Sequence, residues 1–534
     1  MSKHYLPYKE TGYFSKLICD YLDEDEAVKG FYSNFPSLEN FKDQLERKHF
    51  SQENRSVLVS ALKAQYKNTE VDEAVNSALN SLSEKNTFTV TTGHQLNLFT
   101  GPLYFLYKII STIKLAETLK EAYPKSNFVP VYWMATEDHD FDEINYFRIH
   151  GKKIQWNRED VLDNNKGAVG AFDTFGLEAI LELICAEFGT TQIAKDLCTL
   201  FEDAYINQDN LANATRFLAN SLFGKYGLVI VDGNDKDLKR VFTPFIEQEL
   251  VDQIAYKYVT AQAEELENKG YPVQVNAREI NLFYLLPNSR ERILEKEGQF
   301  YINNTDLVFT KDAIITELKE HPERFSPNVI MRPLYQEVIL PNLAYIGGGG
   351  EIAYWLELKS FFDKVNVTFP VLMLRNSALL ITQKQHQKLN KLDLSLEEIF
   401  LKQNDLINRK IRKISNIDVD FSQQKEHLIR QFEDLYKIAS ETDASFLGAV
   451  KAQEVKQLKG LDNLEKRLLT AQKKKLGDHI QRFTSIQNEL FPSQNLQERV
   501  MNFSEFYLEH GDKLIPALFE ALDPLDNRFT VIIL

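Results

Sequence analysis

The spacing of apolar side chains divides the first part of the chain into helices and buried strands. Residues 1–85 predict helices, because their apolar positions follow a helical repeat that includes Leu58, Leu62, Val71, Val75, Leu79 and Leu82. Two β-branched and apolar runs, residues 88–92 and 128–134, predict buried strands. A helix is predicted between them from Pro102 onward, since proline in the first helical turn costs no hydrogen bond. This order of elements forms a βαβ unit, whose crossover is right-handed.

The chain from residue 145 to residue 382 predicts more strands, interrupted by insertions. The predicted elements are short antiparallel strands at 145–165, helices at 175–223, a buried strand at 226–233, one or two helices at 237–268, a small β-rich insertion at 271–315 with turns at 287–289 and 303–304, and a core strand at 368–374. Buried strands that alternate with helices are typical of an α/β fold with a parallel sheet.

Residues 383–490 have a different pattern. No proline lies between Pro370 and Pro492, and apolar residues recur at a spacing of three and four, at Leu458, Leu461, Leu464, Leu468, Ala471, Leu476, Ile480, Phe483, Ile486 and Leu490. A break at residues 416–420 predicts a hairpin of two long antiparallel helices, about 60 Å long at 1.5 Å per residue. We expect a coiled coil that supports a homodimer; a helical bundle is the alternative. The tail ends in a predicted closing strand at 529–533.

Size and charge exclude some classes of protein. A chain of 534 residues is too long for one hydrophobic core, so we expect two to four domains. The 77 acidic residues outnumber the 62 basic ones and give a formal charge of −15. This balance argues against a dedicated nucleic-acid-binding protein, which needs a basic face to neutralise phosphates.

Cysteine usage and hydropathy predict a cytoplasmic protein. The three cysteines, Cys19, Cys185 and Cys198, follow no metal-ligand spacing and predict reduced thiols without a disulfide framework. The first residues lack an apolar signal region, and no apolar run is long enough to cross a bilayer. We therefore expect no membrane association.

The loop after the first predicted strand is the first candidate site. It lies between a strand and a helix N-terminus, where free backbone N–H groups and the helix dipole favour anions. An empty structural turn is the alternative. The candidate binding residues in this loop are Gly93, His94, Gln95, Asn97, Thr100 and Gly101.

An acidic cluster directly after the second predicted strand is the second candidate. Its members Glu137, Asp138, His139 and Asp140 combine carboxylates with an imidazole, a combination suited to acid and base catalysis or to binding an amine. By itself, the cluster is more typical of a solvated acidic turn with one histidine. Its expected position beside the Gly93 loop, at the carboxyl ends of neighbouring strands, favours a functional site.

A glycine-rich segment is the third candidate. Four consecutive glycines end at Gly350 and allow the backbone to approach a ligand closely, although a flexible turn is the commoner meaning of such a run. No Gly-Lys-Ser/Thr follows, so the segment is not a Walker A loop. Arg332 can bind a carboxylate or phosphate through two parallel hydrogen bonds. The other candidate residues here are Gly348, Gly349, Glu351 and Tyr354, the last two on one helix face.

Three long motifs in this order resemble the bacillithiol-biosynthesis cysteine-adding enzyme family over the whole chain. They are TTGHQLNLFTGPLYFLYKIISTIKLA, VPVYWMATEDHDFDEIN and RPLYQEVILPNLAYIGGGGEIAYWLELKSFF. The chain departs from the family pattern at two points. The commoner Gly-Gln-Gln is Gly93-His94-Gln95 here, and the familiar Gly-Gly-Pro-Gly-Glu lacks its proline before Glu351.

The resemblance implies an α/β fold with a Rossmann-like core similar to class I aminoacyl-tRNA synthetases, with connecting-peptide insertions and an antiparallel coiled coil. The expected domains are a first core part at 1–235, with a helical N-terminal region and an insertion near 150–220, a connecting-peptide-like insertion at 236–327, a second core part at 328–382, the coiled coil at 383–491 and a C-terminal segment at 492–534 that returns to the core.

The resemblance also implies the last step of bacillithiol synthesis, in which L-cysteine is joined to the amine of glucosaminyl malate. Amide formation from a free carboxylate is uphill in water, so we expect activation by ATP or another nucleotide, and we predict no metal. We expect the activated carboxylate over the Gly93 loop. The cluster from Glu137 to Asp140 would accept the proton of the amine, and Arg332 would hold a carboxylate.

Two other functions stay open on the sequence. A metal-dependent amide hydrolase would use His94, Asp138, His139 and Asp140, although no compact ligand motif is present. A non-catalytic assembly protein would use the coiled coil to hold partners.

Overall fold

The computed structural model describes residues 1–158, 167–415, 417 and 419–534. The chain divides into two units. The first comprises residues 1–9, 13–379 and 495–532, and the second comprises residues 10–12, 380–494 and 533–534. Among the residues described, no helix combines the length and hydropathy needed to cross a membrane.

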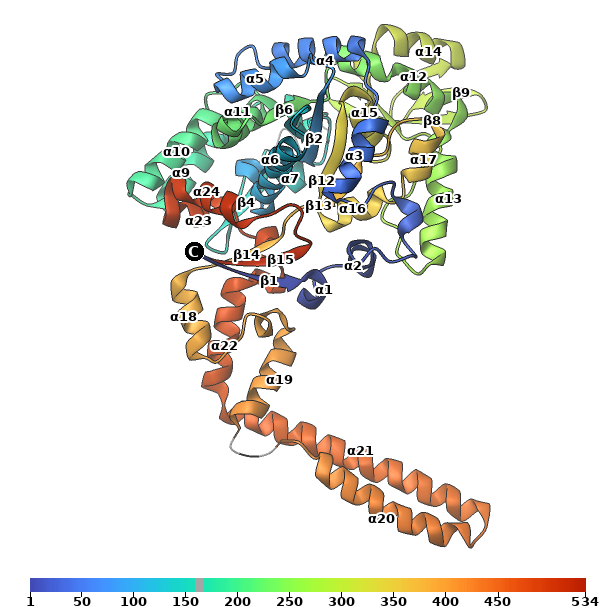
Figure 1. The fold of residues 1–534 in the computed structure, drawn as a ribbon, viewed down its shortest axis with the longest axis vertical. Helices are drawn as coiled ribbons and strands as arrows, with labels where there is room; N and C mark the ends of the chain where they lie inside the picture. The colour runs from blue at the N-terminus through green and yellow to red at the C-terminus, as the bar shows by residue number, and fades with distance from the viewer. Residues whose placement is uncertain (159–166, 416, 418) are drawn as a thin grey trace. The chain divides into compact units, whose positions relative to one another are not determined.

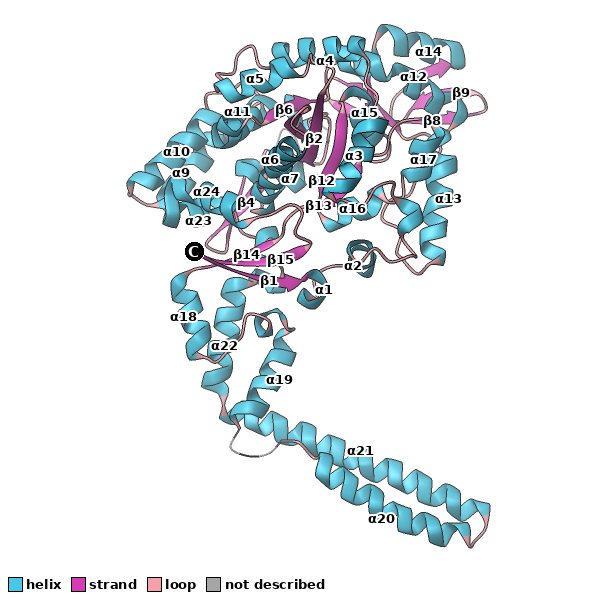
Figure 2. Ribbon diagram, in the orientation of Figure 1, coloured by secondary structure: helices cyan, strands magenta, loops and turns pink. Residues whose placement is uncertain are grey.

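A five-stranded parallel sheet forms the centre of the first unit (Figures 1 and 2). Its strands are β2 (Thr87–His94), β3 (Asn127–Met134), β6 (Val229–Asp232), β12 (Asn342–Gly347) and β13 (Val371–Leu374). The spatial order is β13-β12-β2-β3-β6, and every neighbouring pair is parallel. This is the doubly wound order of Rossmann-like folds, in which the first strand lies between two halves wound in opposite directions. The strands predicted near residues 88, 128, 226 and 368 are confirmed, and β12 is an additional strand.

The crossover helix α6 (Tyr104–Ala122) connects β2 to β3 and is buried along most of its length. Its residues Leu115, Ala116 and Leu119 pack in one core cluster with Val90 of β2 and with side chains from β12 and β13. A helix that is apolar around most of its circumference is expected where it is covered on several sides. The predicted βαβ unit is therefore confirmed.

The N-terminal region is helical apart from its first residues. Its helices are α1 (Tyr8–Thr11), α2 (Lys16–Leu22), α3 (Leu38–Arg47), α4 (Gln52–Gln65) and α5 (Glu73–Ser81). The prediction of helix from residue 1 is wrong, because β1 (Ser2–Pro7) forms a sheet with β15 (Arg528–Ile533) and β14 (Ala378–Ile381), in the order β1-β15-β14. Most residues of β1 are exposed, so its burial shows no strand-like alternation. Its pairing with β15 is what makes it a strand.

The insertion between β3 and β6 begins with the hairpin of β4 (Tyr146–Ile149) and β5 (Lys152–Gln155). This hairpin confirms part of the predicted antiparallel strands; residues 159–166 lie outside the described residues. The predicted helices follow as α9 (Leu177–Phe188), α10 (Gln192–Tyr205) and α11 (Leu211–Phe223).

A disulfide corrects the expectation of reduced cysteines. Cys185 of α9 and Cys198 of α10 are bonded, with their Cα atoms 5.7 Å apart, and Cys19 is free and buried. The two cysteines meet because consecutive helices fold back on each other, a proximity that the separation of 13 residues does not reveal.

The second insertion combines helices with an antiparallel sheet, as predicted. Its elements are α12 (Lys236–Asp252), α13 (Ile254–Asn268), α14 (Lys311–Glu320) and the strands β7 (Leu282–Leu286), β8 (Ser289–Lys296), β9 (Gln299–Ile302), β10 (Val308–Thr310) and β11 (Phe325–Pro327). The strand order is β10-β9-β8-β7-β11. Along the chain, the helix α15 (Met331–Ile339) then precedes β12, and the helices α16 (Gly349–Trp355) and α17 (Lys359–Lys364) follow it.

The second unit is helical. Its helices are α18 (Gln383–Lys391), α19 (Gln403–Ile414), α20 (Ser422–Ser440), α21 (Ala444–Lys475) and α22 (Gly477–Leu490). Helices α20 and α21 run side by side as an antiparallel pair, which confirms the coiled coil (Figure 1). The helices α23 (Phe503–His510) and α24 (Leu514–Ala521) belong to the first unit.

The hairpin turn lies later in the chain than predicted. Residues 441–443 join α20 to α21, and the Asp443 side chain caps α21 by accepting hydrogen bonds from the N–H groups of Ser445 and Phe446. The predicted break at 416–420 instead separates α19 from α20; residues 416 and 418 lie outside the described residues. The 32 residues of α21 correspond to about 48 Å rather than the predicted 60 Å, because the apolar repeat is divided between α21 and α22 at Leu476.

Candidate functional site

The carboxyl ends of β2 and β12 lie side by side, at the point where the two halves of the sheet diverge. Thr92 of β2 is in register with Ile346 of β12, so the Gly93 loop and the glycine run leave the sheet together. Ligands of open α/β sheets bind at this switch point. A cavity of about 340 Å³ lies here, which we call the inner cavity. It is lined by Gly93, His94, Gln95, Tyr104, Lys108, Trp133, Ala135, Arg332, Tyr345, Gly348, Gly350, Glu351, Tyr354, Arg375 and Arg499.

Close backbone packing explains the glycine at position 93. A Cβ atom on Gly93 would lie 3.2 Å from the Tyr345 hydroxyl and 3.8 Å from Arg332 Nη1. A side chain at this position would therefore crowd the Tyr345 hydroxyl, while its distance to Arg332 would be an ordinary van der Waals contact.

A buried ion pair joins the first and third candidate segments. Lys108 of α6 is 3% exposed, and its ammonium donates to the Gly93 carbonyl (2.7 Å) and to Glu351 Oε1 (2.8 Å). Glu351 also accepts from the Gly348 N–H (2.7 Å) and the Tyr345 hydroxyl (3.0 Å). Burial would raise the pKa of Glu351, but Lys108 and these donors hold it below its usual value. Glu351 is therefore ionised, whereas burial lowers the pKa of Lys108, against the effect of Glu351.

Positive charge exceeds negative charge in the inner cavity. Besides Lys108, three arginines line it, whereas Glu351 is its single carboxylate. Arg332 donates to Gln336 (3.1 Å) and the Tyr354 hydroxyl (2.9 Å). Arg375 is 3% exposed and pairs with Glu498 (2.7 Å), yet its buried Nε has no hydrogen-bond partner among the described residues. This arrangement suits an anionic ligand.

His94 is a neutral wall residue. It is 7% exposed, and its ring centroid lies 5.0 Å from that of Phe105 and 5.5 Å from that of Tyr104. Burial and the nearby Lys108 ammonium lower its pKa to about 3. At neutral pH the imidazole carries no charge, so it does not contribute to anion binding through charge.

A second cavity, of about 430 Å³, continues from the first, and we call it the outer cavity. It shares Trp133, Ala135 and Arg332 with the inner cavity. Its other lining residues are Met134, Thr136, Glu137, Asp138, Gly233, Val275, Asn276, Arg278, Phe283, Arg290, Pro327, Asn328 and Val329. The second insertion thus contributes one wall of a site whose floor is the parallel sheet.

The four residues of the acidic cluster have different environments. Glu137 is ion-paired with the buried Lys239 at 2.5 Å. Asp138 accepts from Gln95 Nε2 (2.9 Å), which joins the first and second candidate segments. His139 is 41% exposed and lies 3.2 Å from Arg290 Nη1; burial and Arg290 lower its pKa, against Asp138. Asp140 is exposed and lines neither cavity. Asp138 therefore lines the outer cavity and, among the described residues, forms no ion pair with a lysine or arginine, in contrast to Glu137.

The structure thus brings most of the predicted residues together. Those that line the inner cavity are Gly93, His94, Gln95, Arg332, Gly348, Gly350, Glu351 and Tyr354, and those that line the outer cavity are Glu137 and Asp138. Those that line neither are Asn97, Thr100, Gly101, Gly349, His139 and Asp140.

The predicted loop residues outside the cavities shape the backbone. Phe99, Thr100 and Gly101 all have positive φ, and Asn502 holds this turn by donating to the carbonyls of Phe99 (2.7 Å) and Gly101 (2.6 Å). A Cβ on Gly101 would lie 2.6 Å from Cβ of Asn97, so only glycine fits there. These residues support the loop rather than face a ligand.

The hydrolase alternative requires residues that the structure separates. His94 lines the inner cavity, whereas Asp140 is exposed outside both cavities. Over the part of the chain that the structure describes, no group of three or more His, Cys, Asp or Glu side chains is gathered as metal ligands are.

Sequence reasoning missed several cationic wall residues. They are Lys108, Arg278, Arg290, Arg375 and Arg499. Two of them carry a signal in the sequence. Lys108 interrupts the apolar helix after Pro102, and Arg375 directly follows the strand predicted at 368–374, at the end where ligands bind. The others depend on chain segments that only folding brings to the cavity.

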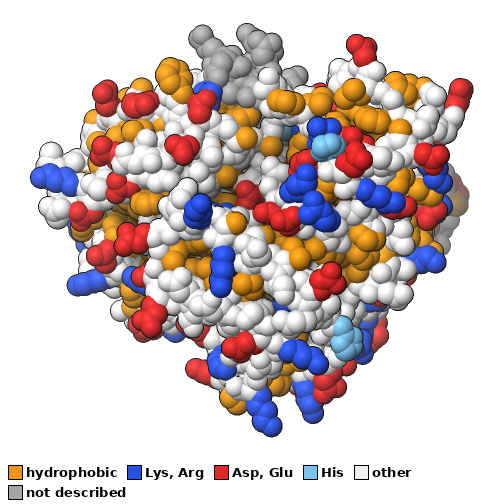
Figure 3. All heavy atoms as spheres, turned by 90° about the horizontal axis from the view of Figure 1, so that it is seen from above, with side chains coloured by type: hydrophobic (Ala, Val, Ile, Leu, Met, Phe, Trp, Pro, Cys, Tyr) orange, Lys and Arg blue, Asp and Glu red, His pale blue; other side chains and the backbone are white. Residues whose placement is uncertain are grey.

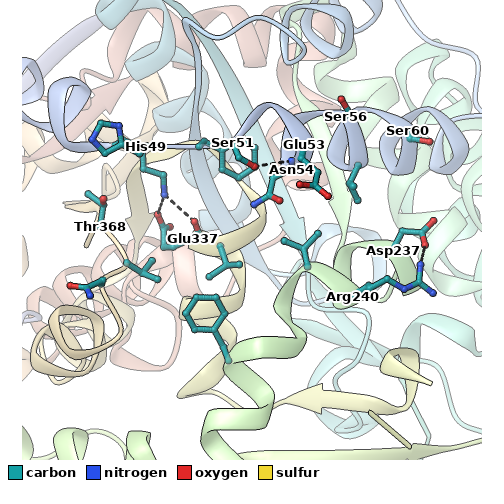
Figure 4. Close-up of a pocket in the computed structure, with 18 residues that line it drawn as sticks. His49, Ser51, Glu53, Asn54, Ser56, Ser60, Asp237, Arg240, Glu337 and Thr368 are labelled. Carbon is teal, nitrogen blue, oxygen red and sulfur yellow. Dashed lines mark hydrogen bonds and ion pairs between the residues drawn. The ribbon is translucent and has the colours of Figure 1, made fainter. Parts of the chain in front are cut away.

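A cavity larger than these two, about 770 Å³, lies elsewhere (Figure 4). Thr368 and Glu337, which line it, precede β13 and β12, so it lies at the amino ends of these strands. Lys48 Nζ donates there to the Glu337 carbonyl (3.0 Å) and lies 3.4 Å from its carboxylate. This cavity contains none of the predicted site residues.

The surface carries charges of both signs. Over the face shown in Figure 3, acidic and basic side chains are interspersed, with hydrophobic side chains exposed between them. This mixture of charges is typical of an ordinary solvated surface and not of a surface with an electrostatic potential of a single sign.

Comparison with known proteins gives two family matches that together span the chain. The family model described as "Bacillithiol biosynthesis BshC, N-terminal Rossmann-like domain" matches residues 1–376. The one described as "Bacillithiol biosynthesis BshC, C-terminal coiled-coil domain" matches residues 378–534.

Several full-length relatives are also similar. The "Putative cysteine ligase BshC" of Christiangramia forsetii is 56% identical over 534 residues, which cover 100% of this chain and 99% of the relative. The protein of the same name from Flavobacterium johnsoniae is 57% identical and covers 99% of both chains. That of Cytophaga hutchinsonii is 40% identical, covering 97% of this chain and 96% of the relative.

A solved structure described as a putative arginyl tRNA synthetase from Campylobacter jejuni aligns with 85% of this chain and 100% of its own. Its sequence identity is 10% and its TM-score is 0.20, a likeness too weak to support an argument.

Proposed function

Because the chain belongs to the BshC family of bacillithiol biosynthesis, we propose that it is a cysteine ligase that joins L-cysteine to the amine of glucosaminyl malate. The observation that carries this proposal is the pair of connected cavities. They differ in character and meet at Trp133, Ala135 and Arg332, as expected where two substrates react.

The inner cavity suits the carboxyl group of cysteine and the group that activates it. Its excess of positive charge and the unpartnered Nε of Arg375 fit phosphate oxygens as well as a carboxylate. Lys108, Arg375 and Arg499 would hold a nucleotide phosphate there. A bound nucleotide of the ATP type would supply the energy that makes the cysteine carboxyl group reactive.

The outer cavity suits glucosaminyl malate, whose malyl group carries two carboxylates. Arg290 is held by hydrogen bonds to Ser326 Oγ (3.1 Å) and the Pro327 carbonyl (2.9 Å). Arg278 is exposed on the same wall, and within the described ranges its guanidinium forms no hydrogen bond or ion pair. The two cations complement the two carboxylates of the malyl group.

Asp138 lies where the amine would enter from the outer cavity. In the reaction, the amine nitrogen bonds to the cysteine carboxyl carbon, the activating group leaves, and the amine gives up a proton. Asp138 is tied to the Gly93 loop through Gln95 and can accept this proton. Glu137 is less suited to that role because Lys239 neutralises it.

Thiol profiling of a deletion strain supplied with variants tests this function. Asp138→Asn and Arg332→Ala should fail to restore bacillithiol, whereas Asp142→Asn, a neighbouring exposed carboxylate, serves as the matched control and should restore it. Normal bacillithiol with Asp138→Asn and Arg332→Ala at wild-type protein levels would disprove the assignment.

We also propose that the α20–α21 hairpin holds two copies of the chain together. Exposed apolar side chains recur along both helices, at Ile429, Leu435, Ile438, Phe446, Leu447, Val455 and Leu464. Exposed apolar side chains that recur along a helix pair are typical of an interaction surface.

A further inference from the structure

A buried carboxylate and amide lie behind the wall of the outer cavity. Glu249 of α12 and Asn281, which precedes β7, are both 0% exposed. Glu249 Oε1 accepts from the Asn281 N–H (2.9 Å) and from its side-chain Nδ2 (2.8 Å). Glu249 Oε2 accepts from the Ala255 N–H (2.9 Å), so among the residues that the structure describes all partners of Glu249 are hydrogen-bond donors without charge.

The Asn281 side chain, held by Glu249, forms hydrogen bonds with the backbone of Arg278. Its Oδ1 accepts from the Arg278 N–H (3.1 Å), and its Nδ2 donates to the Arg278 carbonyl (2.7 Å). Both backbone groups of Arg278 are thereby fixed by one side chain. The guanidinium of Arg278 has no such anchor, so the direction of this side chain depends on its backbone.

Asn281 also reaches the helix that carries the other arginine of the wall. Its Oδ1 accepts from Asn328 Nδ2 (3.0 Å), and its carbonyl accepts from the Asn328 N–H (3.1 Å). Asn328 Oδ1 accepts from the Ile330 N–H (2.9 Å), and the Asn328 carbonyl accepts from the Arg332 N–H (2.8 Å). One buried amide thus links the backbones of Arg278 and Arg332.

A role in stability alone does not explain a buried carboxylate without a counter-ion. Burial raises the pKa of Glu249, against the three hydrogen bonds that it accepts. Well-packed apolar side chains are often as stable as buried charges in such positions. The polar network is better explained by the fixed geometry that it imposes on the cavity wall.

We propose that Glu249 and Asn281 are positioning residues, which hold Arg278 so that its guanidinium binds a carboxylate of the amine substrate. This inference rests on the proposed function, because it requires glucosaminyl malate in the outer cavity. Arg332 has its own side-chain anchors at Gln336 and Tyr354, so the network acts mainly through Arg278.

Titration calorimetry of the full chain with glucosaminyl malate and, separately, with L-cysteine tests the proposal. Asn281→Ala and Glu249→Ala should weaken glucosaminyl malate binding about tenfold or more, the usual effect of misplacing a charge-assisted hydrogen bond. Cysteine binding should stay within about threefold of wild type, since its cavity keeps its own anchors. A loss of stability alone would not produce this difference between the two ligands.

Two conservative variants sharpen the test. Glu249→Gln keeps an oxygen facing Asn281 and should retain glucosaminyl malate binding within about threefold. Asn281→Asp has the shape of asparagine but loses both Nδ2 hydrogen bonds, so it should show the same selective loss as Asn281→Ala. Because it also places a second carboxylate beside the buried Glu249, Glu249→Ala gives the second measurement if the Asn281 variants do not fold.

Gln44→Ala is the matched control. Gln44 is a buried amide that donates to the Phe369 carbonyl (2.9 Å) and is far in sequence from the wall residues. The positioning role is disproved if Arg278→Ala loses glucosaminyl malate binding but the Asn281 variants bind as Gln44→Ala does. If Arg278→Ala itself binds normally, the placement of the substrate in the outer cavity fails, and the positioning role fails with it.

Discussion

Protonation of Glu357 should make the stability of the first unit depend on pH. Glu357 is 0% exposed, and its carboxylate accepts from the backbone N–H groups of Gln274 (2.6 Å) and Val275 (3.2 Å). These residues begin the coil that leads to Arg278. Burial raises the pKa of Glu357 to about 7, against both hydrogen bonds.

The sign and size of the effect follow from the raised pKa. The folded protein holds a proton on Glu357 that the unfolded chain releases above its ordinary pKa of 4.5. The resulting stability is fully present below pH 4.5 and is lost as the pH rises through 7. One pKa unit corresponds to about 1.4 kcal/mol, so Glu357 should lower the free energy of unfolding by about 3 kcal/mol across this range.

Glu357→Gln isolates this contribution, because glutamine resembles the protonated acid and does not titrate. Urea unfolding of both proteins at pH 5, 6, 7 and 8, followed by tryptophan fluorescence, measures it. The three tryptophans, Trp133, Trp156 and Trp355, all lie in the first unit and report on it alone. The variant should gain stability relative to wild type as the pH rises. Equal pH dependence of the two proteins would refute the reasoning.

Three further predictions concern the site and the hairpin. Lys108→Met leaves the half-buried Glu351 without its cation and should cost about 2 kcal/mol of stability and abolish bacillithiol formation in cells; full activity would contradict the charged pair. Gly93→Ala places a Cβ 3.2 Å from the Tyr345 hydroxyl and should weaken cysteine binding about tenfold with little change in glucosaminyl malate binding, as measured by calorimetry. Ile438→Glu with Leu447→Glu should yield monomers in sedimentation velocity, and an unchanged mass would exclude the hairpin as the interface.

The predictable part of the fold is local. The β-branched residues of β2 and the apolar run of β3 identify buried strands, and the proline before α6 marks where that helix begins. The candidate loops were also predictable, because parallel strands direct their carboxyl ends to one edge of the sheet. Gln95 and Asp138 meet there as expected.

The errors fall where distant segments decide the structure. β1 is a strand because it pairs with β15, at the far end of the chain. Cys185 and Cys198 meet because α9 and α10 fold back on each other. The hairpin turn lies at Asp443, which caps α21. The cap is a local signal in the sequence, but the break near residue 417 interrupts the helical pattern more strongly and therefore predicts the turn there.

The sequence by itself determined the parallel α/β core, the helical hairpin, the family, and the two glycine-bearing loops with the acidic cluster between them. Each of these depends on residues that are close in the chain. Only the tertiary structure decided which charges form the site. It buried Lys108 against Glu351, neutralised Glu137 with Lys239, and brought Arg278 to the cavity through Asn281. The reason is that burial and pairing set the charge and position of a side chain, and both depend on contacts between segments that are separated in the chain, such as those that carry Lys108 and Glu351.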